Sequence, residues 1–145
     1  MPPLNLIRIL DANFNRLREG LRVVEEFHRF FKPNRGLAWR LKQLRHKVLN
    51  LETILEIDQA LYLESRDVHG DFGAYATAAA EKKRLNLGHI VTASHKRAQE
   101  SARVLEEMAK LIVPKKIKEF KAFRFALYEL EKKSSEIIKK LGRTN

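Results

Sequence analysis

The chain of 145 residues contains no cysteine, which excludes disulfide bonds and any zinc site built on thiolates. No apolar run approaches the roughly 20 residues that cross a membrane as a helix. The opening stretch, MPPLNLIRIL, has too short an apolar part for a secretory signal. From its length and these absences, we expect a single domain, residues 1–145, that is cytoplasmic.

The common nucleotide-binding motifs are also missing. The sequence has neither GxxxxGK[ST] nor GxGxxG. The stretch Asp71-Phe72-Gly73 spells a magnesium motif of protein kinases, but no Gly-rich loop, VAIK strand or HRD accompanies it, so we treat the match as chance. The five histidines show no convincing metal spacing, and the single tryptophan, Trp39, falls at core spacing rather than on a base-stacking surface.

Positive charge is abundant. Lysine and arginine number 29 against 18 aspartates and glutamates, which leaves a net charge of +11. Such an excess favours anionic partners such as nucleotides, phosphorylated metabolites or nucleic acid. Dense lysine and glutamate on outer helix faces is also typical of heat-adapted proteins, so the charge alone does not choose a partner.

Four segments show the 3.6-residue periodicity of amphipathic helices, at about 6–31, 34–55, 87–112 and 115–141. Pro33 and Pro114 fall at the short corners within each pair, and proline suits the first turn of a helix. Each pair should therefore fold back as an antiparallel hairpin.

The two hairpins repeat each other. The stretch DANFNRLREGLRVVEE (11–26) matches TASHKRAQESARVLEE (92–107), and KQLRHKVLNLE (42–52) matches KAFRFALYELE (121–131). This predicts an all-α four-helix bundle in which hairpins of about 6–55 and 87–141 are related by a pseudo-two-fold axis. The connection at about 56–86 contains SRDVHGDFG and an alanine-rich stretch, and a connection of this length is often functional.

Arginines occupy positions that the periodicity places inside the bundle. Arg16 shares a stripe with apolar or small residues, and Arg97 occupies the matching place in the second hairpin. Arg45 and Arg124 lie among apolar residues on the second helix of each hairpin. A buried, unpaired charge costs several kcal/mol, so each arginine needs a partner.

Two interpretations follow. In the first, the arginines close a structural network with nearby acids, for which the candidates are Glu19, Glu100, Glu52 and Glu131. In the second, they converge on an interior site for a di- or triphosphate, because guanidinium groups match phosphate oxygens. Gly20 and Ser101 would leave room for such a ligand, or would serve close helix packing.

The blocks RILDANFNRLREGLRVVEEFHRFF, KQLRHKV, SRDVHGDFG and RAQESARVLEE together resemble the small helical kinase of thiamine biosynthesis that phosphorylates hydroxymethylpyrimidine phosphate. In many bacteria that domain is fused N-terminal to thiamine phosphate synthase. The resemblance runs from about Arg8 to Glu131. The second copy departs from the pattern at Ser94 and His95, which weakens the equivalence of the two halves.

The resemblance implies ATP-dependent phosphorylation of the pyrimidine monophosphate, with ATP as a substrate and magnesium as the ion. The nucleophile would be an ionised phosphate oxygen, so no general base is needed, and arginines with a carboxylate-held magnesium would neutralise charge. A separate thiamine phosphate synthase is the expected protein partner, and a homo-oligomer is left open; neither a membrane nor nucleic acid is expected.

The residues assigned on this basis fall into three groups. The phosphate-holding, catalytic group is Arg16, Arg97, Arg45 and Arg124. The substrate- and cofactor-binding group is Asn13, Arg22, Arg66, Arg103 and His95. The metal-binding group is Glu19, Asp67 and Asp71, although each of these acids is also a plausible salt-bridge or turn residue.

The alternatives belong to other classes. One is a non-catalytic helical module that docks on a thiamine-pathway enzyme, with purely structural arginines. The other is a basic bundle that binds nucleic acid, whose binding would weaken steeply with salt.

Overall fold

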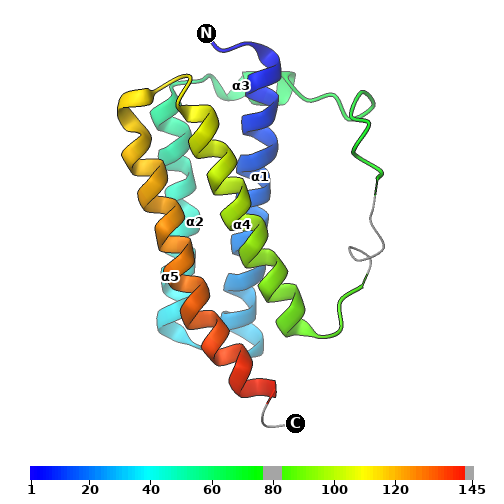
Figure 1. Cartoon of the computed structure of the whole chain (residues 1–145), viewed down its shortest axis with the longest axis vertical. Coiled ribbons are helices and arrows are strands. Elements are labelled where there is room, and N and C mark those ends of the chain that lie inside the picture. The colour runs from blue at the N-terminus through cyan, green and yellow to red at the C-terminus, as the bar shows by residue number, and fades with distance from the viewer. Residues whose placement is uncertain (77–82, 143–145) are drawn as a thin grey trace.

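The computed structural model describes residues 1–76 and 83–142, and every regular element in these residues is a helix. Four long helices lie side by side (Figure 1). The first runs opposite to the second and the third opposite to the fourth, whereas the second and third run in the same direction. They are α1 (Leu4–Glu26), α2 (Arg35–Leu55), α4 (Leu87–Ala109) and α5 (Ile117–Gly142). The predicted all-α four-helix bundle is thus confirmed.

Within the part of the chain that the structure describes, three short elements join the long helices. A π-helical turn, η1 (Phe27–Phe31), continues α1 to the bend before α2. A 3-10 turn, η3 (Pro114–Lys116), opens α5, and a short helix, α3 (Gln59–Glu64), lies in the long connection. None of the helices in the described residues is long and apolar enough to cross a membrane.

Asparagine and proline residues mark the starts of three of the long helices. The side chains of Asn34 and Asn86 each accept the backbone N–H three residues on, both at 3.0 Å, and so cap α2 and α4. Pro33 precedes the α2 cap, and Pro114 occupies the first position of the turn that leads into α5. The bends between α1 and α2 and between α4 and α5 therefore lie at the prolines, as predicted.

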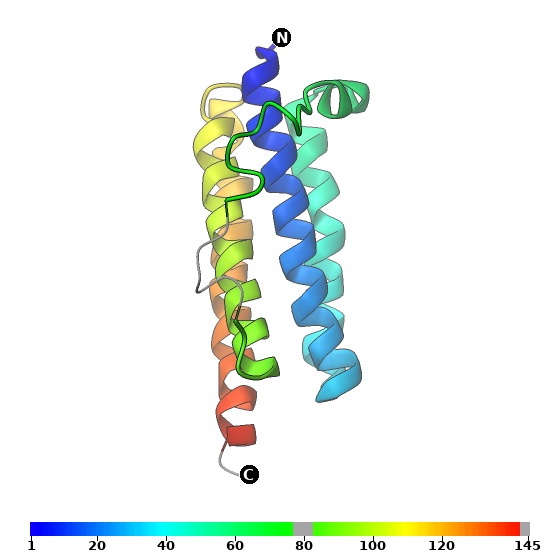
Figure 2. The same ribbon diagram turned by 90° about the vertical axis from the view of Figure 1, so that its right-hand side faces the viewer.

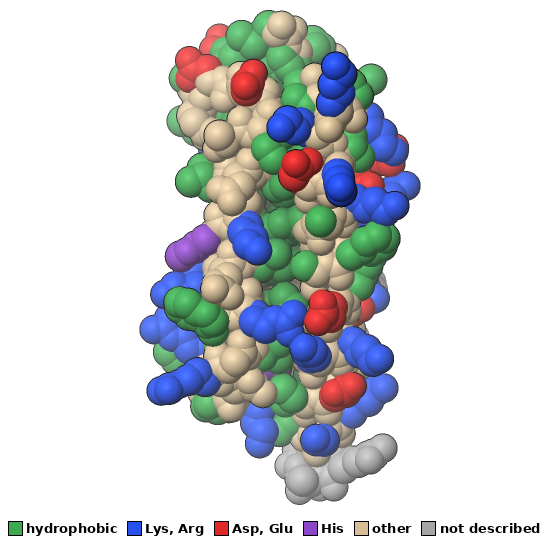
Figure 3. All heavy atoms as spheres, turned by 90° about the vertical axis from the view of Figure 1, so that its left-hand side faces the viewer, with side chains coloured by type: hydrophobic (Ala, Val, Ile, Leu, Met, Phe, Trp, Pro, Cys, Tyr) green, Lys and Arg blue, Asp and Glu red, His purple; other side chains and the backbone are tan. Residues whose placement is uncertain are grey.

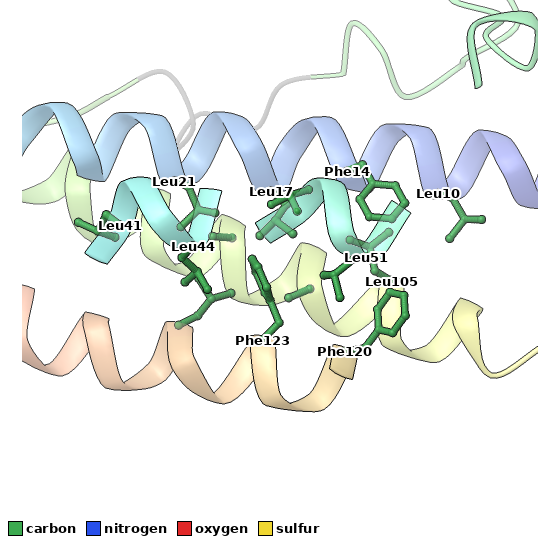
Figure 4. Close-up of a cluster of buried hydrophobic side chains, with 14 of the residues drawn as sticks. Leu10, Phe14, Leu17, Leu21, Leu41, Leu44, Leu51, Leu105, Phe120 and Phe123 are labelled. Atoms are coloured by element: carbon green, nitrogen blue, oxygen red, sulfur yellow. The ribbon is translucent and has the colours of Figure 1, made fainter. Parts of the chain in front are cut away.

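The core is a column of leucine and phenylalanine side chains between the four helices (Figure 4). Burying each such side chain contributes roughly 1.5–3 kcal/mol, so this column supplies the main driving force for folding. The residues labelled in Figure 4 are Leu10, Phe14, Leu17, Leu21, Leu41, Leu44, Leu51, Leu105, Phe120 and Phe123.

Helices α1 and α4 approach each other closely at Gly20. A Cβ atom placed there would lie 2.8 Å from the carbonyl oxygen of Ser94 and 3.3 Å from the Cβ of Ala98. Of the two interpretations of Gly20, the structure supports close helix packing rather than room for a ligand.

The described parts of the long connection lie along the outside of the bundle, where they pass α1 and α4 (Figure 2). Its first part is held on α1: Arg66 donates two hydrogen bonds to the Asp11 carboxylate, at 2.6 and 3.0 Å, and Arg8 donates to the carbonyl oxygen of Asp67 at 2.6 Å. The alanine-rich stretch lies largely outside the described residues. These contacts fix where the SRDVHGDFG segment leaves the bundle.

Candidate functional site

Two of the four predicted phosphate-holding arginines form paired, mostly buried ion pairs. Arg45 donates through Nε and Nη2 to the Glu25 carboxylate at 2.7 and 3.3 Å. Arg124 does the same with Glu106 at 2.6 and 3.4 Å, and its Nη1 donates to the Tyr128 hydroxyl at 3.0 Å. The Glu106 hydrogen bond, supported by Tyr128, raises the pKa of Arg124 further above its ordinary value.

The geometry of these two arginines therefore supports a structural network of Arg–Glu ion pairs. Their partners are Glu25 and Glu106, not the acids that were predicted. Glu25 and Glu106 match each other in the repeat, and the sequence analysis overlooked them as partners. The predicted acid Glu52 instead pairs with Arg18 at 2.7 Å, and Glu131 pairs with Lys96 at 3.0 Å. The matched positions of the two Glu–Arg pairs were the signal that could have identified them.

The expectation that Arg16 and Arg97 point into the bundle is wrong, because both side chains are exposed. The buried side chains of α1 include Leu10 and Leu17, whereas Arg16 and Val23, on the neighbouring stripe, are exposed. Ile9, on that same stripe, is itself 41% exposed. A shift of one residue along a helix turns a side chain by about 100°, which is enough to move it from core to rim.

Several predicted residues do meet in a groove between α1 and α2. Its volume is about 820 Å³. The residues that line it are Arg18, Glu19, Arg22, Val23, Arg45, His46 and Leu49. Three guanidinium groups thus face one groove, beside two apolar side chains that could cover the uncharged part of a ligand. Of these residues, Arg18, Val23, His46 and Leu49 were not predicted as site residues from the sequence.

The groove arginines still have N–H groups to offer a ligand. Arg45 uses Nε and Nη2 on Glu25, which leaves its Nη1 free of that pair, and the ion pair of Arg18 with Glu52 involves only Nη1. Arg22 is exposed and makes no ion pair with the described residues. Guanidiniums that are held in place by buried acids are pre-organised for binding, and Arg22 adds a guanidinium that no ion pair with the described residues engages.

The second hairpin does not reproduce this groove. Gln99 replaces Arg18, and Phe125 and Tyr128 replace His46 and Leu49 in the repeat. Arg103, the counterpart of Arg22, pairs with Glu107 at 3.1 Å and approaches Glu106 at 3.8 Å. The two halves share a fold and a buried Glu–Arg pair, but among the described residues only the first carries an unpaired arginine in a groove of this kind.

The residues predicted to bind magnesium do not come together. Asp67 accepts the backbone N–H of Gly70 at 2.9 Å, and Asp71 accepts that of Gly73 at 2.9 Å, so both shape turns. Glu19 lies in the groove. Within residues 1–76 and 83–142, no group of three acids or histidines is placed to hold a metal ion. ATP and magnesium rest only on the resemblance and stay predictions.

The remaining predicted binding residues have structural contacts. Arg66 is committed to Asp11, whose hydrogen bond raises the pKa of the guanidinium. Asn13 is buried and donates to the Ile9 carbonyl oxygen at 2.9 Å within its own helix. His95 is buried between α4 and α5, and burial lowers the pKa of its imidazole to about 4.

Comparison with known proteins gives a consistent set of relatives. A model of the ThiD2 family matches residues 8–133. A protein of Nostoc punctiforme named thiamine-phosphate synthase is 40% identical over 124 residues, 86% of this chain and 34% of that protein. A thiamine-phosphate synthase of Synechocystis is 40% identical over 129 residues, which cover 89% of this chain and 36% of the relative.

A third relative, from Prochlorococcus marinus, has the same name and is 33% identical over 144 residues, 99% of this chain and 39% of its own length. The chain thus spans little more than a third of the curated relatives it matches. No solved structure matches it.

These relatives correct the activity implied by the resemblance. The prediction of a hydroxymethylpyrimidine phosphate kinase is contradicted, because the matching proteins are named for thiamine-phosphate synthase, a different reaction of the thiamine pathway. The two non-kinase alternatives gain no support from the relatives either.

Proposed function

Because the chain belongs to the ThiD2 family, we propose that it takes part in thiamine-phosphate synthesis by binding a phosphorylated compound in the α1–α2 groove. The relatives are enzymes by name, and each is close to three times as long as the segment it shares with this chain. The proposal therefore includes a thiamine-phosphate synthase as the protein with which this helical domain works, whether joined to it or separate.

One observation carries the proposal: the groove combines the unpaired Arg22 with two arginines that buried acids hold in place. A phosphate group suits such a set, since its oxygens accept several N–H groups at once. The exposed side chain of Leu49 and the half-exposed Val23 offer apolar contact for the rest of the ligand. Glu19 adds a negative charge at the edge, which favours a ligand that also carries a cationic or hydrogen-bond-donating part.

Thiamine phosphate, the compound in the relatives' name, is the ligand to test first. It combines a phosphate with a cationic ring system. We expect calorimetric titration of the chain to show saturable binding of thiamine phosphate and at least tenfold weaker binding of thiamine, which lacks the phosphate. Arg22→Ala should weaken binding of thiamine phosphate by about tenfold or more, because a charge-assisted hydrogen bond contributes roughly 1.5–3 kcal/mol.

Arg103→Ala is the matched control. It removes the same side chain from the equivalent helix position in the second hairpin, where glutamates already pair with it. Its affinity for thiamine phosphate should stay within about twofold of the parent chain, and thermal unfolding should show that both variants fold. Equal loss in the two variants, or equal binding of thiamine and thiamine phosphate, would rule out the groove as the phosphate site.

A further inference from the structure

A second pocket lies at the bend between η1 and α2. Its volume is about 400 Å³, which is within the range of small-molecule sites. Arg29, Arg35 and Lys42 line it together with Trp39, His28 and Glu25. Of the groove residues, none lines this pocket, so the two sites can be tested separately.

Positive charge dominates this bend pocket. Arg35 and Lys42 make no ion pair with the described residues, and Arg29 stacks on the Phe30 ring with its guanidinium carbon 4.8 Å from the ring centre. The lining acid, Glu25, is already matched by Arg45. Basic side chains also gather more widely over this end of the face that α2 and α5 form (Figure 3).

The start of α2 adds to this positive potential. Arg35 is the first residue of the helix, and the first turn contains no acidic residue. The first N–H groups of a helix have no partner within it, and the helix dipole places positive charge there. A cation at this position is unfavourable for the isolated helix, and a bound anion would offset that cost.

An aromatic ring stands beside these charges. The sequence predicted Trp39 in the core, but its side chain is 58% exposed, because the buried stripe of α2 runs through Leu37, Leu41 and Leu44. Exposing a large ring forgoes the free energy of its burial. A ring in this position can instead stack on a planar group of a ligand.

A buried histidine forms part of the pocket wall. His28 lines the pocket and is fully buried, and its Nε2 hydrogen-bonds the Ser134 hydroxyl at 2.7 Å. Its Nδ1 is buried without a hydrogen-bond partner among the described residues. His28 belongs to the π-helical turn, and such turns are rare and frequently occur at functional sites.

We propose that the bend pocket binds a small organic anion that joins a planar ring to a phosphate group. The phosphate would contact the Arg35 and Lys42 side chains and the backbone N–H groups of Arg35 and Gly36, since the Asn34 side chain already accepts the N–H of Leu37. The ring would stack on Trp39. A carboxylate could use the same cations, but a phosphate has more oxygens to accept N–H groups, so three cationic side chains beside a helix N-terminus favour phosphate.

Trp39 is the only tryptophan in the chain, so its fluorescence reports on this pocket alone. Phenyl phosphate is the probe, with benzoate, inorganic phosphate and benzyl alcohol as comparisons. We expect phenyl phosphate to change the emission saturably, with a midpoint at least tenfold below the midpoint of each comparison. The double variant Arg35→Ala/Lys42→Ala should raise that midpoint by tenfold or more.

Lys47→Ala is the control, since it removes an exposed cation from the same helix outside the pocket. Its midpoint should stay within twofold of the parent chain, and thermal unfolding confirms that each variant folds. The proposal is overturned if phenyl phosphate causes no saturable change up to about 10 mM, if benzyl alcohol acts equally well, or if the double variant binds like the parent chain. A stronger response to short single-stranded DNA, falling steeply with salt, would overturn it in favour of a nucleic-acid surface.

Discussion

Arg124 was predicted from the sequence to bind a ligand, but in the structure it stabilises the fold through an ion pair. Its side chain is 11% exposed, and that of Glu106 is 5% exposed. The hydrogen bond with Glu106 uses two of the guanidinium N–H groups, and Tyr128 accepts another. The pair contributes less by its own attraction than by the cost of leaving either charge buried alone.

Arg124→Met should therefore lower the free energy of unfolding by about 3 kcal/mol or more, because it removes both close hydrogen bonds to the buried Glu106 and leaves it only the Arg103 guanidinium at 3.8 Å. Chemical denaturation at neutral pH measures this loss. The double variant Arg124→Met/Glu106→Leu should recover most of it, since an apolar pair of similar volume removes the buried charge. A single variant as stable as the parent chain would show that Glu106 finds water or another partner.

Among the helices, the α1–α4 contact depends on small side chains. Gly20 lies against the backbone of Ser94, not against the flexible end of a side chain, so the neighbour cannot move aside alone. A larger residue there would force a whole helix to move, which costs free energy of packing. This is why α1 carries glycine at that position in spite of glycine's low helix propensity.

We expect Gly20→Ala to lower the free energy of unfolding by about 1–3 kcal/mol, since overpacking outweighs the gain in helix propensity. Gly36→Ala is the matched control in α2, where an added Cβ would meet only the Asn34 side-chain oxygen at 3.8 Å. That variant should be neutral or stabilised by up to ~1 kcal/mol. Denaturation midpoints decide between these outcomes, and a stabilised Gly20→Ala would mean that α1 and α4 adjust freely.

For the molecule as a unit, two buried histidines link stability to pH. Burial lowers the pKa of both His28 and His95 to about 4. In the unfolded chain their pKa returns to roughly 6.5, so between these values the unfolded state binds more protons. The free energy of unfolding should therefore fall as the pH drops from about 6.5 to 4, by ~3 kcal/mol for each histidine.

His95→Leu should make the loss of stability between pH 7 and pH 4 smaller by about 2–3 kcal/mol, because one of the two proton-linked groups is gone. Urea denaturation at a series of pH values measures this difference. His69→Gln, at an exposed turn position, is the control and should keep the pH dependence of the parent chain. If His95→Leu also left that dependence unchanged, His95 would have to be hydrated in the folded state.

The two hairpins also differ as wholes, which the repeat alone did not reveal. Both keep a buried Glu–Arg pair, Glu25 with Arg45 and Glu106 with Arg124. The first hairpin carries the groove and the bend pocket, and the second has Phe125 and Tyr128 where the groove has His46 and Leu49. The repeated residues thus account for the buried framework and for part of the groove, and the unmatched Arg18, His46 and Leu49 set the groove apart from the second hairpin.

Local sequence patterns were sufficient to predict the helices, their corners and the internal repeat. The patterns are the 3.6-residue period and the prolines at the bends. They also identified Arg45 and Arg124 correctly as side chains in the bundle, because apolar residues surround them at helical spacing. Periodicity resolves these features since neighbouring turns of the same helix create them.

The packing of the helices determines which side of each apolar stripe is buried and which charged side chains pair. Arg16 and Trp39 lie at the borders of their stripes, where the angle of the neighbouring helix determines whether a side chain is buried or exposed. The partners Glu25 and Glu106 sit on a different helix from their arginines, so their distances depend on how each hairpin closes. Such contacts join separate helices, and no periodicity within one helix contains that information.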